Sequence, residues 1–233
     1  MARDFRQDYF ADETIEERRD RAVRIIVALG TIYEEVYCTL DRRADPWELL
    51  VSTILAAQCT DARVNQIVPA LFAEFPDSKA FAESTPEEIE PWIKTCGIFR
   101  NKAKSIHGAA RALHERFGGA VPDNLVDLES LPGVGRKTAN LILGECFGRP
   151  AIVVDTHCSR ISQLLGLTAE RTPLGIEREL QEVLPPEHWI GWGHYMVEHG
   201  RNLCVSGRPQ CGDCALVPYC AYALSESDES PER

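Results

Sequence analysis

Residues 128–143, LESLPGVGRKTANLIL, carry a strong signal for the fold of this chain. Apolar residues at helical spacing lie on both sides of the turn residues 131–135, LPGVG, so two helices joined by a tight turn are expected. Glycine permits unusual backbone angles and leaves nothing above the peptide groups. The N–H groups of this turn, with the N-terminus of the next helix, can point at a phosphate oxygen. Arg136 and Lys137 follow directly and favour a helix-hairpin-helix grip on a nucleic-acid backbone over a simple packing corner.

Lys137 lies in the first turn of the second helix, where the helix dipole and Arg136 disfavour an extra positive charge. An amine that is neutral for part of the time can attack a sugar carbon or form a Schiff base. A lysine that stays charged would only bind phosphate, and this stretch leaves both interpretations open. Asp155, eighteen residues later in VVDTH, can cap the helix that follows and can also face an emerging cation. His157 in the same motif is expected to be structural.

Four cysteines near the C-terminus, with gaps of six, two and five residues, predict one metal centre: Cys204, Cys211, Cys214 and Cys220. A structural zinc ribbon usually offers two CxxC pairs, and this run contains one. Four thiolates from a single loop therefore suit a [4Fe-4S] cluster. The other five cysteines are expected to be reduced, small core residues: Cys38, Cys59, Cys96, Cys146 and Cys158.

The formal net charge of the 233 residues is −11, which taken alone argues against a nucleic-acid partner. The charge distribution differs, because residues 94–137 hold eight Lys and Arg against four Asp and Glu. A basic segment in an acidic surround is compatible with local phosphate binding. No run of about eighteen apolar residues occurs, so no membrane span is expected. The N-terminus is charged with both signs and has no apolar stretch, so no secretory signal is expected.

Helical periodicity runs through nearly the whole chain and no strong strand pattern appears, so the fold class is all-α. Asp45-Pro46 and Thr85-Pro86, each followed by a glutamate at the third helical position, are typical helix starts. The acidic, serine-rich last ten residues, LSESDESPER, are expected to be disordered. Helices are expected at residues 16–37 with a break near Gly30, and at 46–58, 61–75, 85–97, 101–117, 136–147, 156–166, 173–184 and 187–199, with a short one leading to Leu131.

LPGVGRKTAN, VDTH and the spaced cysteines, in this order, resemble the bacterial endonuclease III family. These are iron–sulfur DNA glycosylases with abasic-site lyase activity, of the helix-hairpin-helix superfamily. AAQCTDARVN and KTCGIFRNKAKSI also resemble the family, so the likeness covers about residues 40–222. It implies two helical lobes: a six-helix barrel with the hairpin at residues 39–149, and a lobe of residues 1–38 and 150–223 carrying the [4Fe-4S] cluster. Residues 224–233 would be a disordered acidic tail.

The resemblance also implies roles for single residues. Lys137 corresponds to the nucleophile and Asp155 to the catalytic carboxylate. Gln58 corresponds to a side chain that fills the gap left by a flipped nucleotide, and Ile98 to an apolar wedge between bases. Without the resemblance, Gln58 would be interpreted as an ordinary buried amide and Ile98 as a loop hydrophobe. The full DNA-binding set is Gln58, Ile98, Gly133, Gly135, Arg136, Arg201 and Arg208, with Glu129 and His157 as accessory residues.

The implied activity is removal of oxidised pyrimidines from duplex DNA in base excision repair, through a lysine Schiff base and β-elimination. The implied protein is a monomer in the bacterial cytoplasm, associated with the nucleoid. One alternative is an adenine-mismatch glycosylase of the same superfamily, which would lack the hairpin lysine and carry a further C-terminal domain. Another is a non-catalytic DNA-binding or redox-sensing protein on the same scaffold. Lys137 argues against the first alternative, and Lys137 together with Asp155 argues against the second.

Overall fold

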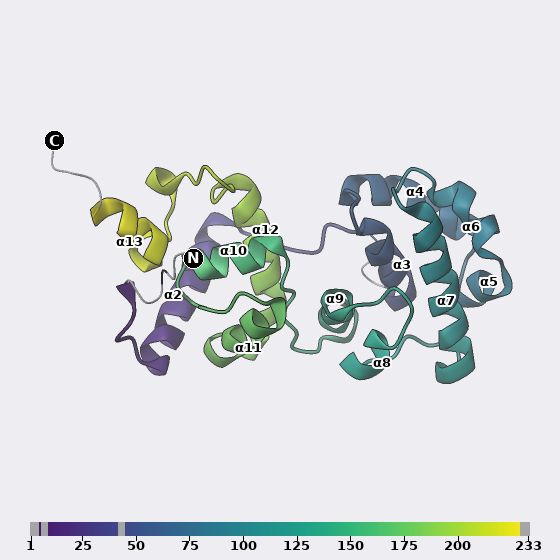
Figure 1. Ribbon diagram of the computed structural model, residues 1–233, viewed down its shortest axis with the longest axis horizontal. Helices are drawn as coiled ribbons and strands as arrows, with labels where there is room; N and C mark the ends of the chain where they lie inside the picture. Colours follow the sequence, from purple (N-terminus) through teal and green to yellow (C-terminus); the bar gives the residue numbers. More distant parts are fainter. Residues whose placement is uncertain (1–4, 6–8, 42–44, 229–233) are drawn as a thin grey trace. The chain divides into compact units, whose positions relative to one another are not determined.

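The computed structural model describes residue 5, residues 9–41 and residues 45–228, with the backbone alone over 226–228. Within this part of the chain the regular structure is helical and no strand occurs, which confirms the all-α class (Figure 1). The chain divides into two compact units: residues 38–149 form one, and the segments before 38 and after 149 form the other. None of the helices described reaches the length and apolarity that crossing a bilayer requires.

The unit of residues 38–149 is built around α7, which packs against α3, α5 and α6 (Figure 1). Phe81 is fully buried, and its ring packs against the rings of Trp47, Phe72 and Phe75 at centroid distances of 5.4, 6.1 and 5.0 Å. The helices are α3 (Pro46–Ala56), α4 (Asp61–Glu74), α5 (Ser78–Glu83), α6 (Pro86–Ile93), α7 (Phe99–Phe117), α8 (Leu125–Glu129) and α9 (Arg136–Phe147).

The helix starts expected from local signals are confirmed. Asp45 Oδ1 accepts a hydrogen bond from the N–H of Glu48 at 2.9 Å. Thr85 Oγ1 accepts one from the N–H of Glu88 at 3.3 Å, and Glu88 Oε2 accepts one from the N–H of Thr85 at 2.7 Å. These contacts satisfy N–H groups that a helix leaves unpaired at its start. Helix α5 was not expected, because six residues are too short to display a helical period; its signal was Asp77, whose Oδ1 accepts from the N–H of Ala80 at 2.8 Å.

The second unit has a continuous core of apolar side chains around the fully buried Trp192. Helix α2 does not break at Gly30, because the burial of Ile25 and Leu29 outweighs the roughly 1 kcal/mol by which one glycine weakens a helix. The helices are α2 (Ile15–Ile32), α10 (Thr156–Leu164), α11 (Pro173–Val183), α12 (Trp189–Asn202) and α13 (Ala221–Asp228), with 3-10 turns η1 (Pro186–His188), η2 (Cys211–Asp213) and η3 (Val217–Tyr219).

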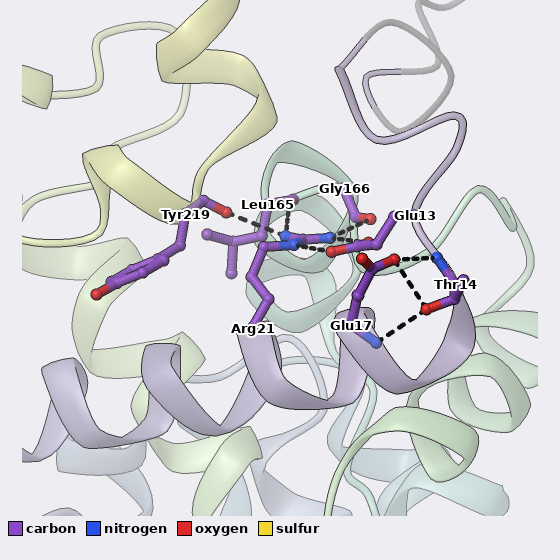
Figure 2. Close-up of polar contacts among 7 residues, drawn as sticks. All are labelled: Glu13, Thr14, Glu17, Arg21, Leu165, Gly166 and Tyr219. Carbon is purple, nitrogen blue, oxygen red and sulfur yellow. Dashed lines mark hydrogen bonds and ion pairs between the residues drawn. The ribbon is translucent and has the colours of Figure 1, made fainter.

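A buried guanidinium ties α2 to two distant segments of this unit (Figure 2). Arg21 Nη1 donates to the carbonyl oxygens of Leu165 at 2.7 Å and Tyr219 at 3.0 Å, and Nη2 donates to that of Gly166 at 3.1 Å. Glu13 supplies the opposite charge. A single side chain therefore joins the N-terminal helix, the end of α10 and the turn just before Cys220.

Part of the tail that was expected to be disordered is helical. Helix α13 continues to Asp228, so residues 224–228 are helical. The N–H of Leu224 donates to the carbonyl of Cys220 at 3.1 Å, and Ser225 is fully buried. This contact with the unit outweighs the polar composition. Residues 229–233 of the expected tail lie outside the described residues.

Candidate functional site

The hairpin expected at residues 128–143 lies between α8 and α9. The four apolar side chains that hold its two helices together are buried: Leu128, Leu131, Val134 and Ile142. Gly133 has a φ of 78°, and a Cβ at this position would lie 2.5 Å from Ser105 Cβ. Only glycine fits both the left-handed backbone and this close approach to α7. The turn is therefore specified by its sequence and by the helix beneath it.

The N-terminus of α9 points out of this turn without a side-chain cap. Gly135 is its N-cap residue and no side chain described in the structure bonds the first N–H groups from that position. A Cβ at Gly135 would meet nothing within 4 Å, so the backbone is open to an approaching group. A helix N-terminus with this access is suited to an anion.

The charged residues of the hairpin lie at the same helix start. Lys137 is exposed in the first turn of α9. Arg136 is half-buried and its Nη1 lies 3.8 Å from Oε2 of Glu129. The acid ahead of the hairpin therefore pairs with the cation after it, and it braces the turn electrostatically.

Gln58 and Ile98 are the two non-glycine residues in the described part of the chain with positive φ, at 56° and 40°. Both side chains are exposed, and Ile98 keeps 52 % of its surface accessible. The buried amide that sequence patterns alone favoured for Gln58 is therefore wrong. Such backbone strain in ordinary residues persists only when the surroundings impose it, and it concentrates at functional positions.

Asp155 and His157 lie in the other unit, at the start of α10. Asp155 is the N-cap residue, and its Oδ1 accepts a hydrogen bond from the N–H of Cys158 at 2.8 Å. The His157 ring lies against Gly200 of α12, in space that any larger residue at position 200 would occupy. This contact gives His157 a packing role. Lys137 and Asp155 thus belong to different compact units.

All four cysteines of the C-terminal run line one pocket with an empty volume of about 390 Å³. Within the described residues, no three His, Cys, Asp or Glu side chains converge on a point that could hold one metal ion. Four thiolates on a single zinc ion would all lie about 2.3 Å from it, whereas the cube of a [4Fe-4S] cluster gives each thiolate its own iron. Four thiols that line one pocket are a donor set that a [4Fe-4S] cluster can use.

Arg160 of α10 and His199 of α12 bring side-chain nitrogen atoms close to the thiols. Arg160 Nη1 lies 3.5 Å from Cys204 Sγ, and Nη2 donates to the Cys204 carbonyl at 2.6 Å. His199 Nε2 lies 3.7 Å from Cys214 Sγ. Burial raises the pKa of Cys220 to about 12 and lowers the pKa of His199 to about 4. The pocket thus favours uncharged groups unless a positive centre enters it.

Arg201 and Arg208 are exposed on either side of Cys204, at the end of α12 and in the following loop. Sequence reasoning missed two buried cations, Arg21 and Lys102. Each is a charged residue inside the apolar stripe of its helix: Arg21 lies beside Ala22 and Ile25, and Lys102 lies one turn before Ile106. A charged residue in an apolar stripe is the sequence feature from which their burial could have been predicted.

The HhH-GPD model, described as a superfamily of base excision DNA repair proteins, matches residues 51–186. Curated relatives named Endonuclease III share most of their length with this chain. The one from Synechocystis sp. is 45% identical over 88% of this chain and 94% of its own. The one from Thermotoga maritima is 39% identical over 78% and 85%, and that from Escherichia coli K12 is 37% identical over 77% and 85%.

Two solved structures also align over most of the chain. "Structure of a non-covalent Endonuclease III-DNA Complex" has a TM-score of 0.82 at 34% identity and covers 91% of this chain and 99% of that one. "Structure of a Trapped Endonuclease III-DNA Covalent Intermediate: Estranged-Adenine Complex" has a TM-score of 0.81 at 35% identity and covers 92% and 99%. The chain belongs to the endonuclease III family, within the HhH-GPD superfamily of base excision DNA repair proteins.

Proposed function

We propose that this chain is a bifunctional DNA glycosylase and abasic-site lyase that removes oxidised pyrimidines from duplex DNA, with Lys137 as its nucleophile. The observation that carries the proposal is Lys137 at an open glycine turn, in a chain whose similar structures include a trapped covalent intermediate with DNA. An exposed amine at a phosphate-binding helix start is well placed to meet a sugar whose base has been flipped out.

In the proposed reaction, neutral Lys137 Nζ attacks the C1′ atom of the damaged nucleotide. The C1′–N bond to the base breaks, and the base leaves with a proton. The C1′–O4′ bond of the sugar then opens, O4′ takes a proton from water, and Nζ becomes joined to C1′ in a protonated Schiff base. The Schiff base acidifies the C2′ proton, whose removal breaks the C3′–O3′ bond and cuts the strand on the 3′ side. Asp155 stabilises the positive charge that develops on the sugar and assists the proton transfers. Water then releases the lysine.

The DNA-binding residues divide into backbone and base contacts. Gly133 and Gly135 present N–H groups to a phosphate, and Arg136, Arg201 and Arg208 add charge. Gln58 fills the space left by the flipped nucleotide, and Ile98 wedges between neighbouring bases. Glu129 supports this set by orienting Arg136, and His157 by packing on α12.

We also propose that the second unit holds a [4Fe-4S] cluster on Cys204, Cys211, Cys214 and Cys220. When bound, the group would supply four iron–thiolate bonds that order the loop displaying Arg208. Residues 39–149 would then serve as the barrel with the hairpin, and residues 1–38 with 150–223 as the cluster lobe. We propose further that the protein acts as a monomer at the bacterial nucleoid.

Borohydride trapping tests the proposed nucleophile. Incubation with a duplex that contains an abasic site, followed by reduction, should give a covalent adduct with the wild type and none with Lys137→Ala. Lys104→Ala is the matched control, because Lys104 is an exposed lysine of the neighbouring α7, and it should form adduct at the wild-type rate. A wild type without adduct would favour a non-catalytic DNA-binding protein and end the proposal.

Metal analysis tests the proposed cluster separately. The purified protein should be brown, with broad absorbance near about 400 nm and with matching amounts of iron and acid-labile sulfide. Stoichiometric zinc without iron would overturn the assignment and leave the proposal for Lys137 intact.

A further inference from the structure

The two strained residues of the 38–149 unit lie in separate loops that meet. Gln58 lies between α3 and α4, and Ile98 lies between α6 and α7. A Cβ on Gly97 would lie 3.9 Å from the Gln58 carbonyl oxygen, which is ordinary van der Waals contact. A β-branched residue in the left-handed region, as at Ile98, is a genuine outlier of backbone geometry. Something in the surroundings must hold both loops in place.

Lys102 makes the contacts that do so. Its side chain reaches from the first turn of α7 into the interior, where the residue is 3 % exposed. Its Nζ donates to the carbonyl oxygen of Leu55 at 2.8 Å and to that of Cys96. Leu55 precedes Gln58 by three residues, and Cys96 precedes Ile98 by two. One ammonium therefore bridges the backbones just ahead of the two strained residues.

Further contacts join the same two loops. The Ile98 carbonyl accepts hydrogen bonds from the N–H groups of Asn101 at 3.0 Å and Lys102 at 3.2 Å, so the strained residue opens α7 directly. Burial and, after it, the Cys59 side chain raise the pKa of Cys96 to about 11, so the residue after Gln58 lies beside the loop of Ile98. Lys102 lies at the centre of this arrangement.

Burying a lysine at such a position has a free-energy cost that an apolar residue would avoid. Desolvation lowers the pKa of Lys102, which shows that its surroundings disfavour the charge. A buried ammonium loses its hydration, and an apolar residue would continue the stripe formed with Ala103, Ile106 and Leu113. Its three donors, however, can join two carbonyl groups that no apolar residue could hold together.

We propose that Lys102 is a positioning residue that holds Gln58 and Ile98 as one rigid wedge, so that both enter the duplex together when a nucleotide leaves the stack. This inference rests on the function proposed above for these two side chains. The wedge is then a preformed pair of loops held together by the Lys102 ammonium group. We expect the Gln58 and Ile98 side chains to act as one unit.

The test compares binding of two DNA probes, measured by fluorescence anisotropy. One is a duplex with a tetrahydrofuran abasic-site analogue, and the other is the same modified strand alone. Lys102→Met removes the ammonium and keeps an unbranched apolar chain. We expect it to weaken duplex binding about 10- to 100-fold, and single-strand binding less than about threefold, because the wedge is needed only in the duplex. Lys104→Met, which removes the same charge from an exposed position of α7, should leave the ratio of the two affinities unchanged.

A double-mutant cycle separates positioning from general damage. If Lys102 acts through Gln58, then Lys102→Met combined with Gln58→Ala should bind duplex within about twofold of the weaker single variant. The proposal would be overturned if the loss of duplex affinity in the double variant equalled the product of the two single losses. It would also be overturned if Lys102→Met bound duplex as tightly as the wild type. Circular dichroism checks folding, and Lys102→Gln, which keeps one donor group, replaces Lys102→Met if the latter unfolds. If both unfold, Lys102 supports the barrel as a whole and the proposal fails.

Failure of the proposed function would look different. A wild type that forms no borohydride-trapped adduct contradicts the role of Lys137. A Gln58→Ala variant that loses equal affinity for duplex and single strand contradicts the wedge itself. When the wild type forms the adduct and Gln58→Ala has a duplex-specific loss, an inert Lys102→Met refutes the positioning role alone.

Discussion

Arg21 and Glu13 form a two-point ion pair inside the second unit, with Nε 2.6 Å from Oε1 and Nη2 2.8 Å from Oε2 (Figure 2). The remaining donors of Arg21 are taken by carbonyl groups of Leu165, Gly166 and Tyr219. Both partners are nearly buried, with side-chain exposures of 8% and 9%. The pair therefore connects the N-terminal helix to the segment that carries Cys220, the last of the four C-terminal cysteines.

Arg21→Met should destabilise this unit strongly. Removing one partner leaves Glu13 and three carbonyl groups without their donor, and loss of a buried pair typically lowers the free energy of unfolding by about 3–5 kcal/mol. Urea unfolding followed by circular dichroism measures the change. Arg24→Met is the control, because Arg24 is exposed on the same helix, and it should change stability by less than about 0.5 kcal/mol. Equal effects of the two variants would contradict the role of the Arg21 contacts.

The two hairpin glycines should respond differently to alanine. At Gly133, with φ of 78°, alanine is strained and its Cβ meets Ser105, so the free energy of unfolding should fall by about 1–3 kcal/mol. At Gly135 alanine meets nothing, so the loss should stay below about 1 kcal/mol. The methyl group would, however, add bulk beside the N–H groups that we propose to bind a phosphate. Gly135→Ala should therefore bind duplex DNA several-fold more weakly while folding normally, and unchanged binding would argue against a backbone grip there.

Asp155 has a structural and a proposed chemical role that two substitutions separate. Asn is as good an N-cap as Asp, so Asp155→Asn should keep the bond to the N–H of Cys158 and the stability of the wild type. It should still lower the single-turnover rate of base removal by about 100-fold or more, because the carboxylate charge is lost. Asp155→Ala should show the same rate loss and also about 1 kcal/mol of destabilisation. Full activity of Asp155→Asn would reduce Asp155 to a cap.

Three cysteines outside the run of four near the C-terminus should resist alkylation in the native protein. Burial raises the pKa of Cys96 to about 11 and the pKa values of Cys146 and Cys158 to about 12. A raised pKa keeps a thiol protonated, so at pH 8 only about one thiol in a thousand or fewer is the reactive thiolate. Labelling with iodoacetamide should be negligible at pH 8 and should grow as the pH approaches 11.

Mass spectrometry after labelling identifies the modified residues. The denatured protein is the control, and all three cysteines should react there at the rate of a free thiol. Rapid labelling of any of the three in the native protein would contradict the raised pKa of its thiol.

Local signals were enough for the hairpin and for several helix starts. Gly133 provides the backbone angle, and a cap residue with a following proline marks a helix start within a few residues. The same locality explains what was missed. Helix α5 is too short to show a period, and residues 224–228 are helical because of contacts with the rest of their unit, which composition does not reveal.

The all-α class, the glycine turn with Lys137, the cap at Asp155 and the single run of four cysteines can all be predicted from the amino-acid sequence, because each depends on neighbours along the chain. Only the tertiary structure decided that Gln58 and Ile98 are strained and exposed, and that Arg21 and Lys102 are buried among carbonyl groups. Lys102 finds Leu55 forty-seven residues away, and Arg21 finds Tyr219 one hundred and ninety-eight residues away. Such partners are brought together by packing, and no pattern of adjacent residues records them.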